Sequence, residues 1–364
     1  MQKTQLYKIL FLAVFWVSCF LFIIFYEGAV TNYKPITPDS IPFNFITLIP
    51  VVLISLIGAS FTATFEVLIF SKIFRKKPLG KTLFYKTSIY LLNMVFWFSV
   101  GNMIFKSLDL GKPIYDKLVI ENYVSFLFSH RFLLLLIYWG FVTFLGLFFL
   151  QVNDKFGQGI LMNFLIGRYH QPKVEDRIFL FMDLKDSTSI AEKLGHIKYS
   201  QLLQDCYYDL TEVVIKYNAQ IYQYVGDEVV LTWEVEKGLM NNNCLNVFFV
   251  YDKLIKRKSE YYSQNYSLIP EFKAALNIGE VTVAEIGEIK KELAFHGDVL
   301  NTAARIQNVC NDFQKRILIS QSMKTNLDRQ KEFSFGLVGK VKLRGKRQSI
   351  NIYDVKTSWD RNRT

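Results

Sequence analysis

Apolar residues are unevenly distributed along the chain. Before about residue 150 they form long runs, and after it they form short blocks separated by charged residues. A helix of about 20 apolar residues can cross a bilayer. We therefore expect spanning helices at Ile9–Tyr26, Phe45–Phe70, Phe84–Phe105 and Val124–Leu150. No small-residue cleavage site follows the first run and three more runs come after it, so we interpret it as a retained helix rather than a signal peptide.

Cationic residues in the short loops predict the orientation of these helices. The first outer loop carries only Lys34, whereas the link between the second and third runs carries Lys72, Arg75, Lys76, Lys77 and Lys81. Short loops rich in Lys and Arg stay cytoplasmic, so we expect both termini in the cytoplasm. The formal net charge of +11 is then better explained by a lipid bilayer than by a nucleic-acid partner.

Three ionisable residues fall inside or near the predicted spans: Glu66, His130 and Arg131. Such residues are costly in a membrane and suggest function by default. All three lie near the ends of runs, where snorkelling or local pairing explains them better. We interpret the first 150 residues as an anchor and leave open that they act as a sensor.

The composition suggests four segments. We predict a membrane domain at 1–150, a connector at 151–176, a soluble domain at 177–356 and a tail at 357–364. In the connector, Ile160, Leu161, Phe164 and Leu165 have helical spacing, which favours an amphipathic helix at the membrane surface or a dimer seam. Pro172 should end it. The four cysteines, Cys19, Cys206, Cys244 and Cys310, have no paired spacing and are expected to be reduced.

The soluble half predicts alternating strands and helices. We expect strands at 177–183, 219–225, 228–233, 272–280, 282–287, 316–320, 333–344 and 350–355, and helices through 218, over 239–264 and after residue 296. Several hairpins in this order indicate an α+β sheet domain.

Two acids occupy the ends of neighbouring predicted strands. Asp183 ends "RIFLFMD", and Asp227 lies in the turn of "YQYVGDEVVLTW", where Gly226 can take a positive φ. Carboxylates at adjacent strand ends can hold Mg²⁺ ions for a phosphoryl transfer, provided that the strands pair. Alone, each acid is more often a turn or cap residue. Since neighbours on a strand alternate, we expect Glu228 on the face opposite Asp227 and outside the site.

A third motif changes this balance. In "HGDVLNTAARIQ", Asn301 and Arg305 are four residues apart and project from one face of a helix. Arginine suits phosphate, and asparagine can hold a hydroxyl group.

Together, "FMDLKDST", "YQYVGDEVVLTW", "HGDVLNTAARI" and "KLRGKRQSINIYDV" resemble the catalytic domain of class III adenylate and guanylate cyclases. The resemblance covers roughly residues 177–355. It implies a ferredoxin-like sheet domain that works as a head-to-tail homodimer with each active site shared across the interface. With the four apolar runs, the expected fold class is an α-helical membrane domain followed by this α+β cyclase domain.

The resemblance assigns roles by position. Asp183 and Asp227 match the metal-binding aspartates, with the carbonyl of Leu184 as a further ligand for two Mg²⁺ or Mn²⁺ ions per active site. The turn of Lys185, Asp186, Ser187 and Thr188 would bind the triphosphate, although Asp186 stands where many relatives have glycine. From the partner subunit, Asn301 would orient the ribose and Arg305 would stabilise the α-phosphate, while Lys346 would bind the β- and γ-phosphates.

The implied reaction converts a nucleoside triphosphate to its 3′,5′-cyclic nucleotide and pyrophosphate. ATP is the expected substrate, but the base-reading positions hold Gln223 and Ala294 in place of the usual pair. Glutamine can both donate and accept hydrogen bonds, and alanine offers no side-chain hydrogen bond. A guanylate or other-base cyclase therefore remains an alternative.

Three other interpretations of the sequence are weighed against a nucleotide cyclase. A diguanylate cyclase is disfavoured because "VGDEVV" lacks the double glycine of that class and the Asn301 and Arg305 pair has no place there. A degenerate domain that only binds partners or nucleotides is disfavoured because both acids, Asn301, Arg305 and Lys346 are present. A receptor or transporter in which the membrane half is the principal actor is left open.

Overall fold

A computed structural model describes residues 3–30, 45–74, 77–156, 163, 166–289, 291–327, 332–342 and 349–357. Its contacts divide the chain into two compact units, Met1–Lys155 and Phe156–Thr364. Each unit is described by itself below. The first, which contains the predicted spans, is called the membrane unit, and the second, whose sequence resembles the cyclases, is called the cyclase-domain unit. The predicted helix residues of the connector, Ile160, Leu161, Phe164 and Leu165, lie outside the described residues.

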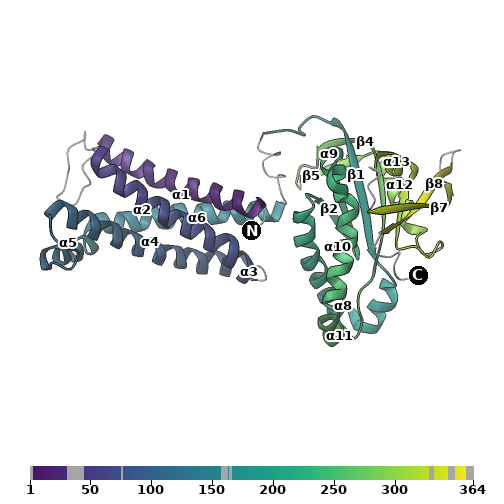
Figure 1. Cartoon of the computed structure of the whole chain (residues 1–364), viewed down its shortest axis with the longest axis horizontal. Coiled ribbons are helices and arrows are strands. Elements are labelled where there is room, and N and C mark those ends of the chain that lie inside the picture. Colours follow the sequence, from purple (N-terminus) through teal and green to yellow (C-terminus); the bar gives the residue numbers. More distant parts are fainter. Residues whose placement is uncertain are drawn as a thin grey trace. The chain divides into compact units, whose positions relative to one another are not determined.

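The first unit is a bundle of helices (Figure 1). Its elements are α1 (Lys3–Val30), α2 (Phe45–Phe65), the π-helical turn η1 (Glu66–Phe70), α3 (Ser71–Ile73), α4 (Leu79–Leu110), α5 (Lys117–Leu127) and α6 (His130–Phe156). Among the described residues, four helical stretches are long and apolar enough to cross a membrane: Lys8–Tyr26, Val52–Phe70, Leu79–Leu110 and His130–Val152.

The fourth predicted span begins later than the sequence suggested. Residues 124–127 belong to α5, a separate helix that starts where the Asp116 side chain accepts a hydrogen bond from the backbone N–H of Leu118. Helix α5 ends at Leu127, with Phe128 as its C-cap residue. The Ser129 hydroxyl then accepts a hydrogen bond from the N–H of Phe132 in the first turn of α6. Two capped starts thus separate a continuous apolar run into two helices.

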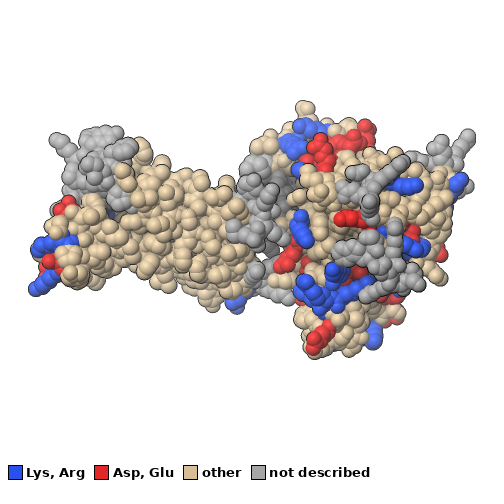
Figure 2. All heavy atoms as spheres, in the orientation of Figure 1, with Lys and Arg blue, Asp and Glu red and all other residues tan. Residues whose placement is uncertain are grey.

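The bundle turns large apolar side chains outward. Phe11, Phe22, Phe84 and Leu92 are all more than half exposed. Figure 2 shows the long side of this unit almost free of charged residues, which lie at its two ends. Inside, the Lys86 ammonium lies 2.5 Å from Glu66 Oε1, and the Tyr90 hydroxyl donates to Glu66 Oε2. Glu66 is therefore paired locally, as expected.

The cyclase-domain unit alternates strands and helices. Its strands are β1 (Lys173–Leu184), β2 (Gln220–Val225), β3 (Glu228–Glu234), β4 (Phe272–Ile286), β5 (Glu292–His296), β6 (Ile317–Ser320), β7 (Phe333–Lys342) and β8 (Ser349–Thr357). Its helices are α8 (Ser187–Lys216), α9 (Val235–Leu239), the 3₁₀ turn η2 (Met240–Asn242), α10 (Asn243–Arg257), α11 (Ser259–Tyr266), α12 (Asp298–Asn308) and α13 (Gln321–Asn326).

The described strands form one eight-stranded sheet in the order β2-β3-β1-β4-β6-β8-β7, with β5 paired to β4. The β4/β6 pair is parallel and the other pairs are antiparallel. This mixed sheet with helices agrees with the predicted α+β cyclase fold. Because β1 lies between β3 and β4, the end of β1 is placed beside the β2–β3 hairpin.

Successive side chains of β1 point to opposite faces of the sheet and enter two different cores. Ile178, Leu180 and Met182 pack with α8 and α10 in the larger core on one face of the sheet. Phe179 and Phe181 pack with Val299 and Ala303 of α12 on the other face. Asp183 continues this second series, so its side chain belongs to the face that α12 covers.

The structure differs from the predicted elements in three places. The helix expected at 239–264 is divided into α10 and α11, because the chain leaves the helix at Lys258. The strands expected at 272–280 and 282–287 are one strand, β4. β5 was not predicted. Its residues are ordered by pairing along β4 from Thr282 to Ile286, a tertiary contact that local sequence does not encode.

Candidate active site

The structure brings Asp183 and Asp227 together. Asp183 is the last but one residue of β1, and Asp227 lies in the β2–β3 turn. As the metal-site prediction required, the two strands that carry these acids are paired, because β1 pairs with β3. Gly226 has a φ of 61° in the turn, a conformation that glycine adopts without cost.

The surroundings of Asp183 disfavour its charge. Burial raises the pKa of Asp183, and so do a hydrogen bond and the negative charge of Asp227. Two groups act in the opposite direction: Gln307 Nε2 donates to Asp183 Oδ2 at 3.0 Å, and Lys273 Nζ lies 3.4 Å from the same oxygen. Neither Gln307 nor Lys273 was singled out from the sequence, because both meet Asp183 only through the fold.

Glu228 belongs to this acidic site, and the expectation that it lies outside is wrong. It pairs directly with Asp183 across β1 and β3, so the two side chains share one face of the sheet. Burial first, and then the charges of Asp183 and Asp227, raise the pKa of Glu228 to about 7. Side chains alternate between faces only along a strand, and Asp227 lies in a turn, so its position does not predict the face of Glu228.

The donor atoms at this site fit a hard divalent cation. The Leu184 side chain is buried in the core, which leaves its backbone carbonyl as the group that could bind a metal. Among the described residues, no group of three or more His, Cys, Asp or Glu side chains is arranged to hold a metal ion. Mg²⁺ commonly uses one or two carboxylates with substrate phosphates and water, and the Asp183 and Asp227 pair suits that mode.

The turn after β1 explains the unusual residue at 186. Asp186 has a φ of 57°, in the left-handed region where glycine is favoured and Asp is tolerated. The backbone N–H of Lys185 donates to the Glu271 carbonyl at 2.8 Å, so it is already used within the fold. Ser187 and Thr188 open α8, where the first N–H groups of a helix have no partner within the helix and attract anions.

The two positions expected to read the base lie on β2 and β5. Gln223 is exposed on β2, the strand at the end of the sheet, next to an irregularity between Ile221 and Gln223. Ala294 is buried on β5. Their neighbours Tyr222 and Phe295 are in edge-to-face contact with ring centroids 4.9 Å apart. This contact between the rings brings the two strands' candidate positions to one region.

Helix α12 presents different residues on its two sides. Its start approaches the sheet closely at Gly297, where a Cβ atom would lie 3.0 Å from the carbonyl oxygen of Glu280. Gln307 turns toward Asp183, whereas Asn301 is exposed and Arg305 is half-buried. Asn301 and Arg305 thus lie on a different side of α12 from the acid pair of the same chain. Lys346 lies outside the described residues.

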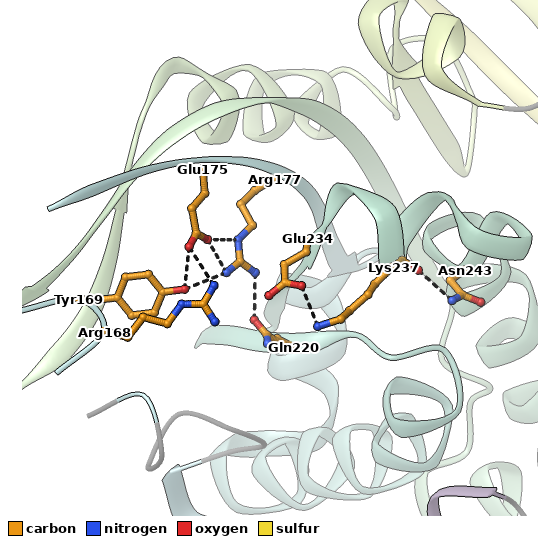
Figure 3. Close-up of polar contacts among 8 residues, drawn as sticks. All are labelled: Arg168, Tyr169, Glu175, Arg177, Gln220, Glu234, Lys237 and Asn243. Carbon is orange, nitrogen blue, oxygen red and sulfur yellow. Dashed lines mark hydrogen bonds and ion pairs between the residues drawn. The ribbon is translucent and has the colours of Figure 1, made fainter. Parts of the chain in front are cut away.

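A polar cluster holds the opposite end of β1 (Figure 3). The buried guanidinium of Arg177 donates to Glu175 Oε2 at 2.7 and 2.9 Å and to Gln220 Oε1 at 3.1 Å. Tyr169 donates to Glu175 Oε1 at 2.9 Å. The Arg177 guanidinium also lies 5.4 Å from the ring centroid of Phe295, so the cluster supports the strand that carries Ala294.

The sequence has known relatives over this unit. It is 32% identical over 177 residues to adenylate cyclase 2 of Rhizobium meliloti (strain 1021), covering 49% of each chain. It is 26% identical over 184 residues to an adenylate cyclase of Anabaena cylindrica, covering 49% of this chain and 36% of that one. The chain thus spans half or less of the length of these curated relatives.

Solved structures of cyclases also align with the chain. A bacterial light-regulated adenylyl cyclase gives a TM-score of 0.49 at 18% identity, covering 57% of this chain and 60% of that one. The adenylyl cyclase CyaB from P. aeruginosa gives a TM-score of 0.46 at 19% identity, covering 52% of this chain and 97% of that one.

Residues 170–357, slightly more than half of the chain, match the family described as adenylate and guanylate cyclase catalytic domain. The match spans all eight strands of the sheet and includes Asp183, Asp227, Asn301 and Arg305. This chain belongs to the adenylate and guanylate cyclase catalytic domain family.

Proposed function

We propose that the protein is a membrane-anchored nucleotide cyclase that converts ATP to 3′,5′-cyclic AMP and pyrophosphate. The observation that carries this proposal is the contact between the Asp183 and Asp227 carboxyl groups where β1 meets the β2–β3 turn. The choice of ATP is supported by the name of the relative that is 32% identical, adenylate cyclase 2.

Asp183, Asp227 and the Leu184 carbonyl would hold Mg²⁺ or Mn²⁺, two ions per active site. Bound cations would lower the pKa of the ribose 3′-hydroxyl and stabilise the charge on the phosphate oxygens. A bound cation would also relieve the effect of the Asp227 charge on Asp183, which disfavours the charged form of Asp183 in the metal-free protein.

The remaining residues would position the nucleotide. In the reaction, the 3′-oxygen bonds to the α-phosphorus, the bond to the pyrophosphate oxygen breaks, and the hydroxyl proton leaves to solvent. Backbone N–H groups at the start of α8, near Asp186, Ser187 and Thr188, together with Lys185 and Lys346, would bind the triphosphate. Arg305 would stabilise charge on the α-phosphate and Asn301 would orient the ribose.

A homodimer would complete each site. Asn301 and Arg305 lie on a different side of α12 from Gln307, which contacts Asp183. A second chain could bring its own α12 to the acid pair of the first. This arrangement would place Gln223 and Ala294 beside the bound base, where Gln223 can pair with adenine or guanine.

Product analysis tests the activity and the base together. The purified full chain is incubated with ATP, GTP, CTP and UTP in the presence of Mn²⁺, and cyclic products are identified by mass spectrometry. We expect cyclic AMP as the main product. Cyclic GMP alone would reject the assignment of ATP, and no product from any nucleotide would reject the enzyme.

Subunit mixing tests the shared site. The variants Asp183→Asn and Arg305→Ala are each expected to lose most of their turnover. In a mixed dimer, one site carries both changes and the other carries neither, so co-expression should restore part of the turnover. If the mixture stays as inactive as either variant alone, the site does not draw Asp183 and Arg305 from different chains.

The anchor and its orientation belong to the same proposal. Four described helices are long and apolar enough to cross a bilayer, and cationic loop residues favour cytoplasmic termini. We propose the division expected from the sequence, 1–150, 151–176, 177–356 and 357–364, with the limits of the cyclase domain moved outward to include all of β1 and β8. The protein should stay in the membrane pellet after alkaline carbonate extraction, and protease should cleave the cyclase domain only in inverted vesicles.

A further inference from the structure

The membrane unit contains a cavity of about 180 Å³. Residues from α1, α2, α4, α5 and α6 line it, among them Trp16, Gly58, Trp97, Asn102, Arg131 and Trp139. It lies within the first unit and shares no residue with the acid pair of the cyclase-domain unit. For comparison, an apolar cavity of about 150 Å³ is large enough to bind benzene.

The walls of the cavity are largely aromatic. The ring centroid of Trp139 lies 6.2 Å from the ring centroids of Trp16, Phe20 and Phe98. Trp16 further contacts Tyr90 at 6.1 Å. Such surfaces suit an apolar body and give water few partners.

Several polar atoms at this cavity lack a partner. Within the described part of the chain, the indole N–H groups of Trp97 and Trp139 and the Oδ1 atom of Asn102 are buried and make no hydrogen bond. All three residues line the cavity. A buried polar group without a partner is unfavourable, so an oxygen-bearing molecule in the cavity would stabilise the bundle.

Glycine keeps part of this space open. A Cβ atom at Gly101 would meet only Ile54, at 3.9 Å, so the position has room for a side chain. At Gly58, a Cβ atom would lie 3.1 Å from the Trp97 ring, so this glycine lets α2 approach that ring. Both glycines line the cavity.

We propose that this cavity is a binding site for a small lipophilic molecule that carries an oxygen-containing polar group. The aromatic rings would contact its apolar body. The N–H groups of Trp97 and Trp139 would donate to its oxygen, and a hydroxyl proton would satisfy Asn102 Oδ1. Arg131 adds positive charge to the same wall. The site does not depend on the proposed cyclase reaction.

Benzyl alcohol and toluene are suitable probes because they share a ring and differ in the hydroxyl group. Each is titrated into the full-length protein in lipid nanodiscs while tryptophan fluorescence is recorded. Three of the chain's five tryptophans, Trp16, Trp97 and Trp139, line the cavity. We expect saturable changes with both probes and about tenfold tighter binding of benzyl alcohol, because one hydrogen bond contributes about 0.5–1.5 kcal/mol.

Matched variants separate the cavity from partition into lipid. Gly101→Leu should fill the space and abolish the saturable change, whereas Gly80→Leu, on the same helix α4 but outside the cavity lining, should not alter it. Trp139→Phe keeps an aromatic ring and removes the N–H group, so it should weaken benzyl alcohol and leave toluene unchanged.

The opposite results would overturn the proposal. They are a linear, non-saturable response that is the same in the parent and both glycine variants, or equal affinity for the two probes. If Gly101→Leu fails to fold, an unchanged preference for benzyl alcohol in Trp139→Phe contradicts the site on its own.

Discussion

The two units of this chain use polar groups in opposite ways. In the membrane unit, apolar side chains such as Phe11 and Leu92 are exposed, while the Glu66, Lys86 and Tyr90 cluster lies inside. In the cyclase-domain unit, Ile178 and Leu180 are buried, and the acids gather where β1 meets the β2–β3 turn. In the first unit this cluster pairs opposite charges, whereas in the second unit the clustered acids carry like charges.

This difference separates stability from chemistry. Burial and the charge of Asp227 raise the pKa of Asp183, and burial and both aspartates raise the pKa of Glu228, so these acids cost stability unless a cation binds. The Glu66 and Lys86 charges neutralise each other. Substitutions of the acids in the cyclase-domain unit should therefore change turnover, and substitutions of Glu66 or Lys86 should change the free energy of unfolding.

The largest expected effect is on the acid pair. Asp183→Asn should lower turnover on the order of a thousandfold, the upper scale for losing one preorganised electrostatic group. Because it removes repulsion with Asp227, it should not lower the melting temperature of the metal-free protein. Turnover assays with Mn²⁺ and thermal unfolding in EDTA measure the two effects. An active variant, or a strongly destabilised one, would remove the contrast between the units.

Arg305 tests the same unit from the other side of the site. Arg305→Ala should lower turnover by at least about a hundredfold, because a positioned donor to the phosphate is lost. Arg305→Lys should recover little, since lysine lacks the planar fork of donors. Steady-state kinetics with ATP measure both variants. Unchanged turnover in Arg305→Ala would remove this residue from the mechanism.

In the membrane unit, Lys86→Met should lower the free energy of unfolding by about 3–5 kcal/mol, because the largely buried Glu66 would lose its positive partner and keep only the hydrogen bond from Tyr90. The Lys86 side chain is only 3% exposed. The double variant Glu66→Gln, Lys86→Met should recover most of the loss. Unfolding by SDS, followed by circular dichroism, compares the three proteins. Equal loss in single and double variants would show that packing, not pairing, matters here.

The smallest effect concerns an ion pair in the cyclase-domain unit. Burial alone would raise the pKa of Asp252, but Arg316 and Lys256 outweigh it and hold this pKa below its ordinary value. The stabilisation is therefore present above about pH 4 and is lost as the pH falls further. Asp252→Asn should lower the melting temperature by about 2–4 °C at pH 7, the shift expected for about 1 kcal/mol.

The difference between Asp252→Asn and the parent should shrink toward pH 3, which scanning fluorimetry can follow. A constant difference across this range would mean that the carboxylate charge does not contribute. Comparison with Lys86→Met then contrasts the cost of an unpaired charge in the bundle interior with the cost of losing an ion pair on the partly exposed surface of the second unit.

The sequence predicted the site only where motifs are local. Asp183 and Asp227 follow from strand-end patterns, and Asn301 and Arg305 from helical spacing. Glu228 was placed on the wrong side because the alternation argument counted from a turn residue, while the strand register sets its true partner, Asp183. Gln307 contacts Asp183 from 124 positions away, which no local pattern can encode.

The sequence by itself determined the division into a membrane unit and a cyclase domain, because runs of about 20 apolar residues and ordered strand-turn motifs are local properties of the chain. Only the tertiary structure decided which side chains share a space. The Asp183, Glu228, Lys273 and Gln307 contacts depend on the register of paired strands and the packing of α12. The aromatic cavity likewise depends on how five helices pack, and side-chain packing is set by shape between segments distant in sequence.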